Sequence, residues 1–132
     1  MYYEATIRVT REDKKRGTTK EVNEKIIVEN CNLFAEAELA LMKHQECEVT
    51  ALKRSAIKEF INTNKDGENI FIATITTMFT DDNGKAKEIP YKVALWADDI
   101  TQAHNITKDY MRQGLEDMEL KGINQTKFVE LI

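Results

Sequence analysis

The second half of this sequence repeats the pattern of the first half. Residues 3–61 are typical of strand, turn, strand, helix and strand, and residues 70–132 run through the same series. The similarity is clearest where Tyr3–Ile7 matches Phe71–Ile75. The period of about sixty residues is longer than that of most solenoid repeats. The repeat therefore indicates a duplicated half of a domain rather than an array of small modules.

Alternating apolar and polar residues predict two strands before the helix of each half. Tyr3–Thr10 and Phe71–Phe79 alternate with the period of two that leaves one face buried and the other wet. Val22–Val28 and Ile89–Leu95 follow as the return strands. Each half therefore begins with a pair of antiparallel strands.

The last segment of each half predicts a third strand. In the first half we expect it to run unbroken from Glu48 to Ile61, with a bulge near Leu52–Arg54, where the alternation is imperfect. In the second half Leu120–Ile132 closes the fold. Between the halves, Thr63–Asn69 contains the Asn, Asp and Gly residues of a tight turn. The halves are therefore expected to lie close together and to share a core.

The two hairpin turns differ in charge. Glu12–Lys20 is highly charged and contains no apolar residue, which predicts an exposed loop with the basic tip Lys14–Arg16. This tip is either a solvated turn or a contact for phosphate or an acidic partner. Asp81–Gly84 predicts a tight turn, because the Asn-Gly pair supplies positive φ angles. The spacing of a calcium-binding loop is missing there.

Each half contains one amphipathic helix. Asn32 is the expected N-cap of the first helix, and His44, near its end, is better explained by the helix dipole than by a metal. Asp99 and Gln102 predict a capping box at the start of the second helix. The stripes expected to face the sheets are Leu33, Phe34, Ala37, Ala40 and Leu41 in the first helix, and Ala103, Ile106, Tyr110 and Met111 in the second.

These elements predict an α+β fold of tandem duplicated β-β-α-β units, with six mainly antiparallel strands and two helices. A right-handed crossover from the second strand to the third places the first strand between them, in the order two-one-three. We expect a single domain over residues 1–132, built of two repeats, 1–62 and 69–132, that are joined by the tight turn. The sequence leaves open whether the repeats form one sheet or two.

The sheet faces that point away from the helices carry apolar residues that need cover. We expect Ile27, Ala94 and Trp96 on these faces, packed on each other or on a partner. If the chain leaves them uncovered, the protein should be a dimer or larger, because each large apolar side chain contributes roughly 1.5–3 kcal/mol when it is buried.

Composition indicates an ordinary soluble protein, and the two cysteines, expected to be reduced, suit a cytoplasmic location. No apolar run approaches the roughly eighteen residues of a membrane span, so no membrane contact is expected. Cys31 and Cys47 flank the first helix, too far apart for a disulfide, which predicts reduced thiols. The net charge of −4 argues against a surface that binds phosphates everywhere, but it permits a local basic patch.

Three segments of the first half resemble a known family. They are Ile26–Asn30, Phe34–Glu38 with its Glu-Ala-Glu helix start, and Val49–Arg54. Together they are similar to a small family from Bacteroidetes bacteria and their phages that is described only as a domain of unknown function. Leu52 stands where that family usually has Ile. The resemblance implies a cytoplasmic, phage-encoded type of protein and supplies no activity or catalytic residues.

The chain lacks the motifs of the common enzyme classes, so we expect no catalytic residues, no metal and no cofactor. Its five Gly residues form no phosphate-binding loop, and it has no nucleophile elbow. His44 and Cys47 supply only two of the four ligands that a closed zinc site requires. His104 has no partner at a ligand spacing. A binding protein is therefore the expected class.

Basic residues gather in the first half of the chain. They are Arg8, Lys14, Lys15, Arg16, Lys53, Arg54 and Lys58. Tyr2, Phe60 and Trp96 are expected to offer stacking faces, and cations interleaved with aromatic rings on a sheet are typical of single-stranded nucleic-acid binding. We therefore predict a non-catalytic protein that binds single-stranded nucleic acid through its first repeat. The alternatives are a solvated sheet face without a ligand, and a protein-interaction or homo-oligomeric module that uses exposed strand edges.

Overall fold

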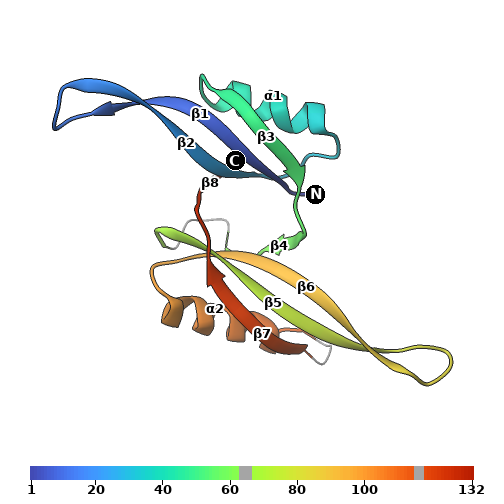
Figure 1. The fold of residues 1–132 in the computed structure, drawn as a ribbon. Helices are drawn as coiled ribbons and strands as arrows, with labels where there is room; N and C mark the ends of the chain where they lie inside the picture. The colour runs from blue at the N-terminus through green and yellow to red at the C-terminus, as the bar shows by residue number, and fades with distance from the viewer. Residues whose placement is uncertain (63–66, 115–117) are drawn as a thin grey trace. The chain divides into compact units, whose positions relative to one another are not determined.

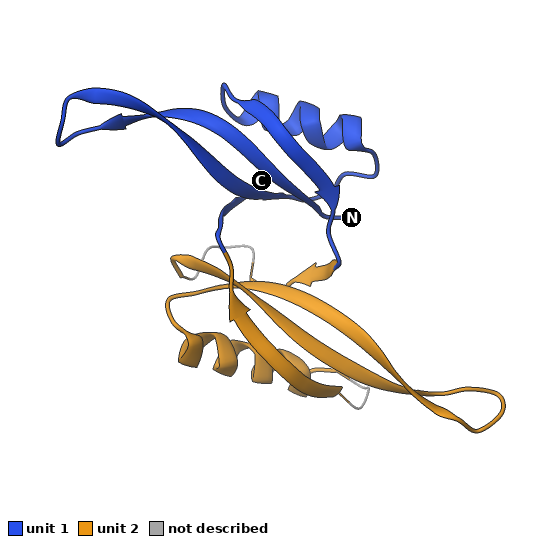
Figure 2. Ribbon diagram, in the orientation of Figure 1, with its two compact units in different colours: residues 1–56, 127–132 blue, residues 57–126 orange. Residues whose placement is uncertain are grey.

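The computed structural model describes residues 1–62, 67–114 and 118–132. The chain forms two compact units (Figure 2), one of residues 1–56 with 127–132 and the other of residues 57–126. We call them unit 1 and unit 2. Residues 63–66, which make up most of the tight turn predicted at Thr63–Asn69, lie outside the described residues.

Unit 1 is a four-stranded sheet with one helix on its face (Figure 1). Its strand order is β3-β1-β2-β8, in which β1 is antiparallel to both neighbours and β8 is parallel to β2. The elements are β1 (Tyr3–Asp13), β2 (Thr18–Val28), α1 (Phe34–His44), β3 (Glu48–Arg54) and β8 (Phe128–Leu131). The order β3-β1-β2 confirms the predicted two-one-three arrangement, to which β8 adds a fourth strand.

The core of unit 1 lies between α1 and one face of the sheet. The alternating residues Tyr3, Ala5, Ile7 and Val9 are at most 3% exposed, as the period of two predicts. From the helix, Ala37 and Leu41 complete this core, with Ala40 packed at its margin. The predicted stripe was wrong at Leu33, which is 58% exposed because it precedes the helix as its N-cap. Phe34 is 48% exposed, but its ring packs edge-on against Tyr3 with the centroids 5.1 Å apart.

Unit 2 has the same arrangement. Its strand order is β4-β6-β5-β7, with β5 antiparallel to both neighbours and β4 parallel to β6. The elements are β4 (Ile57–Phe60), β5 (Asn69–Thr80), β6 (Ala86–Ala97), α2 (Ile100–Arg112) and β7 (Met118–Gln125). Its core joins Phe71, Ala73 and Ile75 of β5 to α2, where the predicted residues Ala103, Ile106, Tyr110 and Met111 face the sheet.

The two helices begin differently. Asp99 caps α2, and its Oδ1 accepts a hydrogen bond of 2.8 Å from the Gln102 N–H, as predicted. In return, the Gln102 side-chain oxygen accepts a hydrogen bond of 2.6 Å from the Asp98 N–H. In a standard capping box the donor would be the N–H of the N-cap itself, which is Asp99. The prediction for α1 was wrong, because its N-cap is Leu33 rather than Asn32 and no side chain caps it.

The described residues form an α+β fold with two helices, and their eight strands in two mixed sheets correct the predicted six. The expected long strand from Glu48 to Ile61 is in fact two strands, β3 and β4, separated at Ser55 and Ala56. The register shift in β3 lies opposite Thr6 and Ile7 rather than near Leu52–Arg54. β3 ends at the Tyr3–Arg54 pair, where its partner strand β1 begins, so β1 offers no further residues for β4 to pair with.

The fourth strand of each sheet comes from the other half of the sequence, and we call β4 and β8 the exchanged strands. β4 follows β3 but pairs with β6, whereas β8 follows β7 but pairs with β2. The pairs Lys25–Phe128 and Lys92–Ile57 occupy equivalent positions, and each is followed by a register shift. The exchanged strand therefore pairs in the same way in both sheets, including the register shift after the first pair.

The connection after β3 is too short for β4 to complete its own sheet. The free position beside β2 lies three strand spacings from β3, about 14 Å away. Ser55 and Ala56, with their flanking bonds, span at most about 11 Å. Each half therefore has to donate its last strand, and neither sheet is complete without the other half of the chain.

A side-chain pair ties each exchanged strand to a helix end. Glu130 of β8 lies 3.1 Å from His44 Nε2, and Glu59 of β4 accepts a hydrogen bond of 2.6 Å from the Tyr110 hydroxyl. Burial and then the bond to Glu59 raise the pKa of Tyr110 well above its usual value, so this hydroxyl stays a donor. At the end of α1, the His44 imidazole lies against the Glu130 carboxylate of β8.

The apolar residues expected on the uncovered sheet faces are buried. Ile27 and Ala94 are 0% exposed and Trp96 is 3% exposed. The prediction of a dimer depended on their being uncovered, so these residues no longer support it.

Gly67 sits where no side chain fits, and its replacement should destabilise unit 2. A Cβ atom there would lie 2.4 Å from the backbone carbon of Ala97. We expect Gly67→Ala to lower the free energy of unfolding by about 1–3 kcal/mol. Gly122→Ala is the matched control, because a Cβ at Gly122 meets nothing within 4 Å. Urea denaturation of the two variants measures the difference, and equal midpoints would contradict this packing.

Candidate nucleic-acid interface

The first hairpin extends beyond its sheet as a two-stranded arm (Figure 1). β3 pairs with β1 only as far as Arg8, and β8 pairs with β2 only from Lys25. Between these limits β1 and β2 pair with each other alone, from Val9–Val22 to Asp13–Thr18. We call residues 9–22 the first arm. It is mostly exposed, so its side chains are free to meet a ligand.

A short turn closes the first arm. The Asp13 carbonyl accepts hydrogen bonds from the Gly17 N–H at 2.9 Å and the Arg16 N–H at 3.2 Å, and its side chain accepts one from Lys15 N–H. Gly17 has φ of 63°, a left-handed conformation that suits glycine. The loop predicted over Glu12–Lys20 is therefore wrong in extent, because strand pairing continues to Asp13 and resumes at Thr18.

The first arm is basic in a protein of net charge −4. It carries the five cations Arg11, Lys14, Lys15, Arg16 and Lys20 against three carboxylates, a net charge of +2. Lys14, Lys15 and Arg16 are exposed at the turn. Within the described part of the chain they form no ion pair, so their charges are not neutralised. These three predicted residues lie next to one another at the tip.

Arg11 and Lys20 were not predicted, and they extend the basic surface along the arm. They pair across the two strands on the side that faces α1. Glu24 binds the Arg11 guanidinium with both oxygens, and the Gln45 side chain accepts a further bond at 3.0 Å. The bond to Glu24 raises the pKa of Arg11 above its usual value. Thr18–Val22 has no alternation of apolar and polar residues, so the sequence carried no signal for a strand here.

The remaining predicted residues do not join this tip. Arg8 lies six residues along β1 from Lys14, about 20 Å away, and is paired with Glu48 at 3.4 Å. Lys53 and Arg54 lie near the opposite end of β1, since Arg54 is opposite Tyr3. Lys58 belongs to β4 in unit 2. The structure therefore gathers three of the seven residues at the tip and places Arg8, Lys53 and Arg54 away from it within unit 1.

The aromatic residues expected to stack on bases are not available for it. Phe60 and Trp96 are 5% and 3% exposed, and their rings pack against each other with centroids 6.3 Å apart. Tyr2 is half-buried. Arg54 lies over the ring of Phe34 at 5.9 Å, so this cation is engaged within the protein. The predicted combination of cations and exposed rings is absent from these positions.

The second hairpin forms an equivalent arm of opposite charge. β7 pairs with β5 only as far as Thr77, which leaves residues 78–88 as the second arm. Its turn confirms the prediction at Asp81–Gly84, with Gly84 at φ of 78° and the Asp81 side chain accepting from Lys85 N–H at 2.8 Å. This arm carries two cations and three carboxylates, a net charge of −1. Only the first arm is therefore suited to phosphate.

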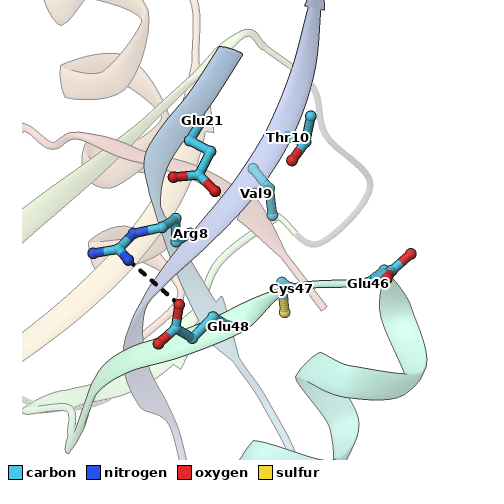
Figure 3. Close-up of a pocket in the computed structure, with 7 residues that line it drawn as sticks. All are labelled: Arg8, Val9, Thr10, Glu21, Glu46, Cys47 and Glu48. Atoms are coloured by element: carbon cyan, nitrogen blue, oxygen red, sulfur yellow. Dashed lines mark hydrogen bonds and ion pairs between the residues drawn. The ribbon is translucent and has the colours of Figure 1, made fainter. Parts of the chain in front are cut away.

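An acidic cleft of about 440 Å³ lies at the edge of β1 where the first arm leaves the sheet (Figure 3). Arg8, Val9, Thr10, Glu21, Glu46, Cys47 and Glu48 line it. Burial raises the pKa of the Cys47 thiol, which makes it a poor nucleophile at neutral pH. Cys31 and Cys47 are both free thiols, as predicted.

Comparison with known proteins identifies the family. The model of the family described as "Domain of unknown function (DUF4494)" matches residues 1–132. The chain belongs to this family. No curated protein and no solved structure matched the chain. In this DUF4494 protein, the described residues contain no group of three or more His, Cys, Asp or Glu placed to hold a metal ion. None of the described helices is long and apolar enough to cross a membrane.

Proposed function

We propose that this DUF4494 protein is a non-catalytic nucleic-acid-binding protein that contacts phosphates with its first arm. The observation that carries the proposal is the tip, where Lys14, Lys15 and Arg16 project together without an ion pair in the described structure. Lys20 adds a further cation along the same arm, whereas Arg11 opposite it is paired with Glu24. Unneutralised Lys and Arg side chains on a projecting element are the usual electrostatic signature of phosphate binding.

The contacts that the first arm offers bear on whether it binds single-stranded or double-stranded nucleic acid. Residues 9–22 contain no aromatic side chain, so the arm cannot stack on bases. Without stacking, the affinity rests on phosphate contacts, which single and double strands both provide. A two-stranded ribbon also fits the major groove of a duplex. Single-stranded nucleic acid remains the ligand predicted from the sequence, and a duplex is the competitor to compare with it.

The test is a titration of fluorescent single-stranded and duplex oligonucleotides at increasing salt. We expect micromolar binding at low salt that weakens as salt rises. If the three tip residues each neutralise one phosphate, the logarithmic slope is about −2 for a single strand and about −3 for a duplex. Absence of binding at low salt and micromolar protein would overturn the proposal.

A second candidate function is a protein-interaction module. Phe79 and Ile89 share one face of the second hairpin and are 53% and 46% exposed, and Met78 on its other face is 51% exposed. Because this hairpin is not basic, a protein partner or a second copy of the chain suits it better than phosphate. A homo-oligomer stays a prediction.

We also infer that the two halves arose by duplication of one β-β-α-β-β segment. The equivalent register shifts at Thr6–Ile7 and Thr74–Ile75 support it. So does the equivalence of the Ile132-to-Ile27 and Ile61-to-Ala94 backbone bonds, at 2.9 and 2.8 Å. The phage or Bacteroidetes origin and the cytoplasmic location implied by the resemblance belong to the same set of proposals.

A further inference from the structure

The edge of β1 that faces away from β2 is unpaired along the first arm. β1 and β2 keep one unbroken register, so successive β1 residues direct their backbone groups alternately to β2 and to the other side. The Tyr2 carbonyl accepts from Ser55 N–H, which shows that even-numbered residues point toward β3. The pairing with β3 ends at Arg8. The N–H and C=O groups of Thr10 and Glu12 therefore point to an edge where no described strand pairs.

The acidic cleft lies beside this free edge. Glu21 stands opposite Thr10 on the arm, Glu48 is the first residue of β3, and Glu46 lies two residues before it. Arg8 is the only cation lining the cleft, and Glu48 already binds it at 3.4 Å. The three carboxylates and one cation give the lining a net charge of −2. Figure 3 shows these side chains around the β1 and β3 ribbons.

We propose that this edge binds an extended basic peptide by strand addition. The peptide lies antiparallel or parallel along Val9–Asp13, in line with β3, and exchanges backbone hydrogen bonds with Thr10 and Glu12. Its Lys or Arg side chains on one face meet Glu21, Glu46 and Glu48. An exposed edge supplies affinity through main-chain bonds, while the carboxylates select the charge of the partner.

This surface is separate from the nucleic-acid contacts proposed above. The cations Arg11 and Lys20 are on the side of the arm that faces α1, whereas Glu12 and Glu21 are on the opposite side. One arm therefore presents a basic face with a basic tip and, on its other side, an acidic face with a free edge. The inference does not depend on nucleic-acid binding, and either can fail alone.

The test uses two synthetic peptides of about ten residues, which is long enough to form one short strand along the free edge at Val9–Asp13. One alternates lysine and threonine, and the other alternates glutamate and threonine. Fluorescence anisotropy at low salt should detect the basic peptide and not the acidic one. Hydrogen exchange should show the amides of Thr10 and Glu12 becoming protected when the basic peptide binds.

Charge variants of the full chain complete the test. Glu46→Lys with Glu48→Lys should weaken binding of the basic peptide by about threefold to tenfold, the range expected when exposed ion pairs become repulsive. Glu38→Lys, on an exposed position of α1, is the control and should leave the affinity unchanged. Lys14→Glu with Lys15→Glu should not weaken it, whatever its effect on nucleic acid.

Three results with the peptides and variants would overturn the inference, and a fourth would come from the protein alone. They are equal binding of the acidic peptide, binding of the basic peptide without protection of Thr10 and Glu12, and no effect of the two charge reversals. Protection of the same amides by raised protein concentration alone, with dimers in light scattering, would assign the edge to a second copy of the chain and overturn the basic-peptide assignment.

Discussion

Changing Lys14, Lys15 and Arg16 together to glutamate should weaken nucleic-acid binding on the order of a hundredfold at low salt. The change removes the three adjacent cations of the tip and puts three negative charges in their place, so phosphate is repelled where it was attracted. The turn should persist, because Asp13 and Gly17, which hold it, are unchanged. Exposed substitutions of this kind usually alter the free energy of unfolding by only about 0.5 kcal/mol.

Two comparison variants locate the effect. Lys85→Glu with Lys87→Glu makes a similar change on the second arm and should leave binding largely intact. Lys53→Glu with Arg54→Glu is the variant that the sequence alone predicts to abolish binding. Since Arg54 is opposite Tyr3 and the tip follows Asp13, about 34 Å separates these sites along β1. If the β3 variant loses as much affinity as the tip variant, the sheet and not the arm is the interface.

Phe60→Ala should destabilise unit 2 by about 3–5 kcal/mol, although Phe60 belongs to the first half of the sequence. Phe60 is 5% exposed and packs on Trp96, and its backbone pairs with Ala94. Removing the ring leaves a cavity beside β6, so the loss should appear in the amides of β5 and β6. Urea denaturation followed by Trp96 fluorescence measures the free energy, and hydrogen exchange identifies the strands affected.

Lys58→Ala is the matched control for this strand, because Lys58 is exposed on β4 and makes no ion pair in the described structure. It should shift the midpoint only slightly. The exchange of β4 would be contradicted if Phe60→Ala lowered the protection of β1 and β2 while β5 and β6 stayed protected. That result would place β4 in the sheet of its own half.

Local patterns were enough to predict the elements that have one buried face. The alternation from Tyr3 to Val9 and the helical spacing of Ala37 and Leu41 report burial directly, because each buried face imposes its own period. The order two-one-three followed from crossover handedness, and it is confirmed as β3-β1-β2. The capping box at Asp99 was readable because its two members are three residues apart.

The first arm was predicted as a loop because it has no buried face. A ribbon of two strands with solvent on both sides buries almost nothing, so residues 10–21 carry no apolar period and resemble a loop. The pairing from Val9–Val22 to Asp13–Thr18 shows that Arg11 and Lys20 lie on paired strands and that Lys14 to Arg16 lie at their tip. That pairing also explains why Lys53 and Arg54 cannot join Lys14 to Arg16, because a strand keeps residues apart in proportion to their separation along it.

The exchange of strands was decided by tertiary structure alone. Glu48 to Ile61 reads as one strand in the sequence, because the period of β3 and that of β4 are the same and only Ser55 and Ala56 separate them. The sheet that each exchanged strand joins depends on pairing partners far away in the sequence. These are Lys92 to Ala94 for β4 and Lys25 to Ile27 for β8. Local residues thus determined that strands form here. The short link and the free positions beside β2 and β6 decided which sheet each strand completes.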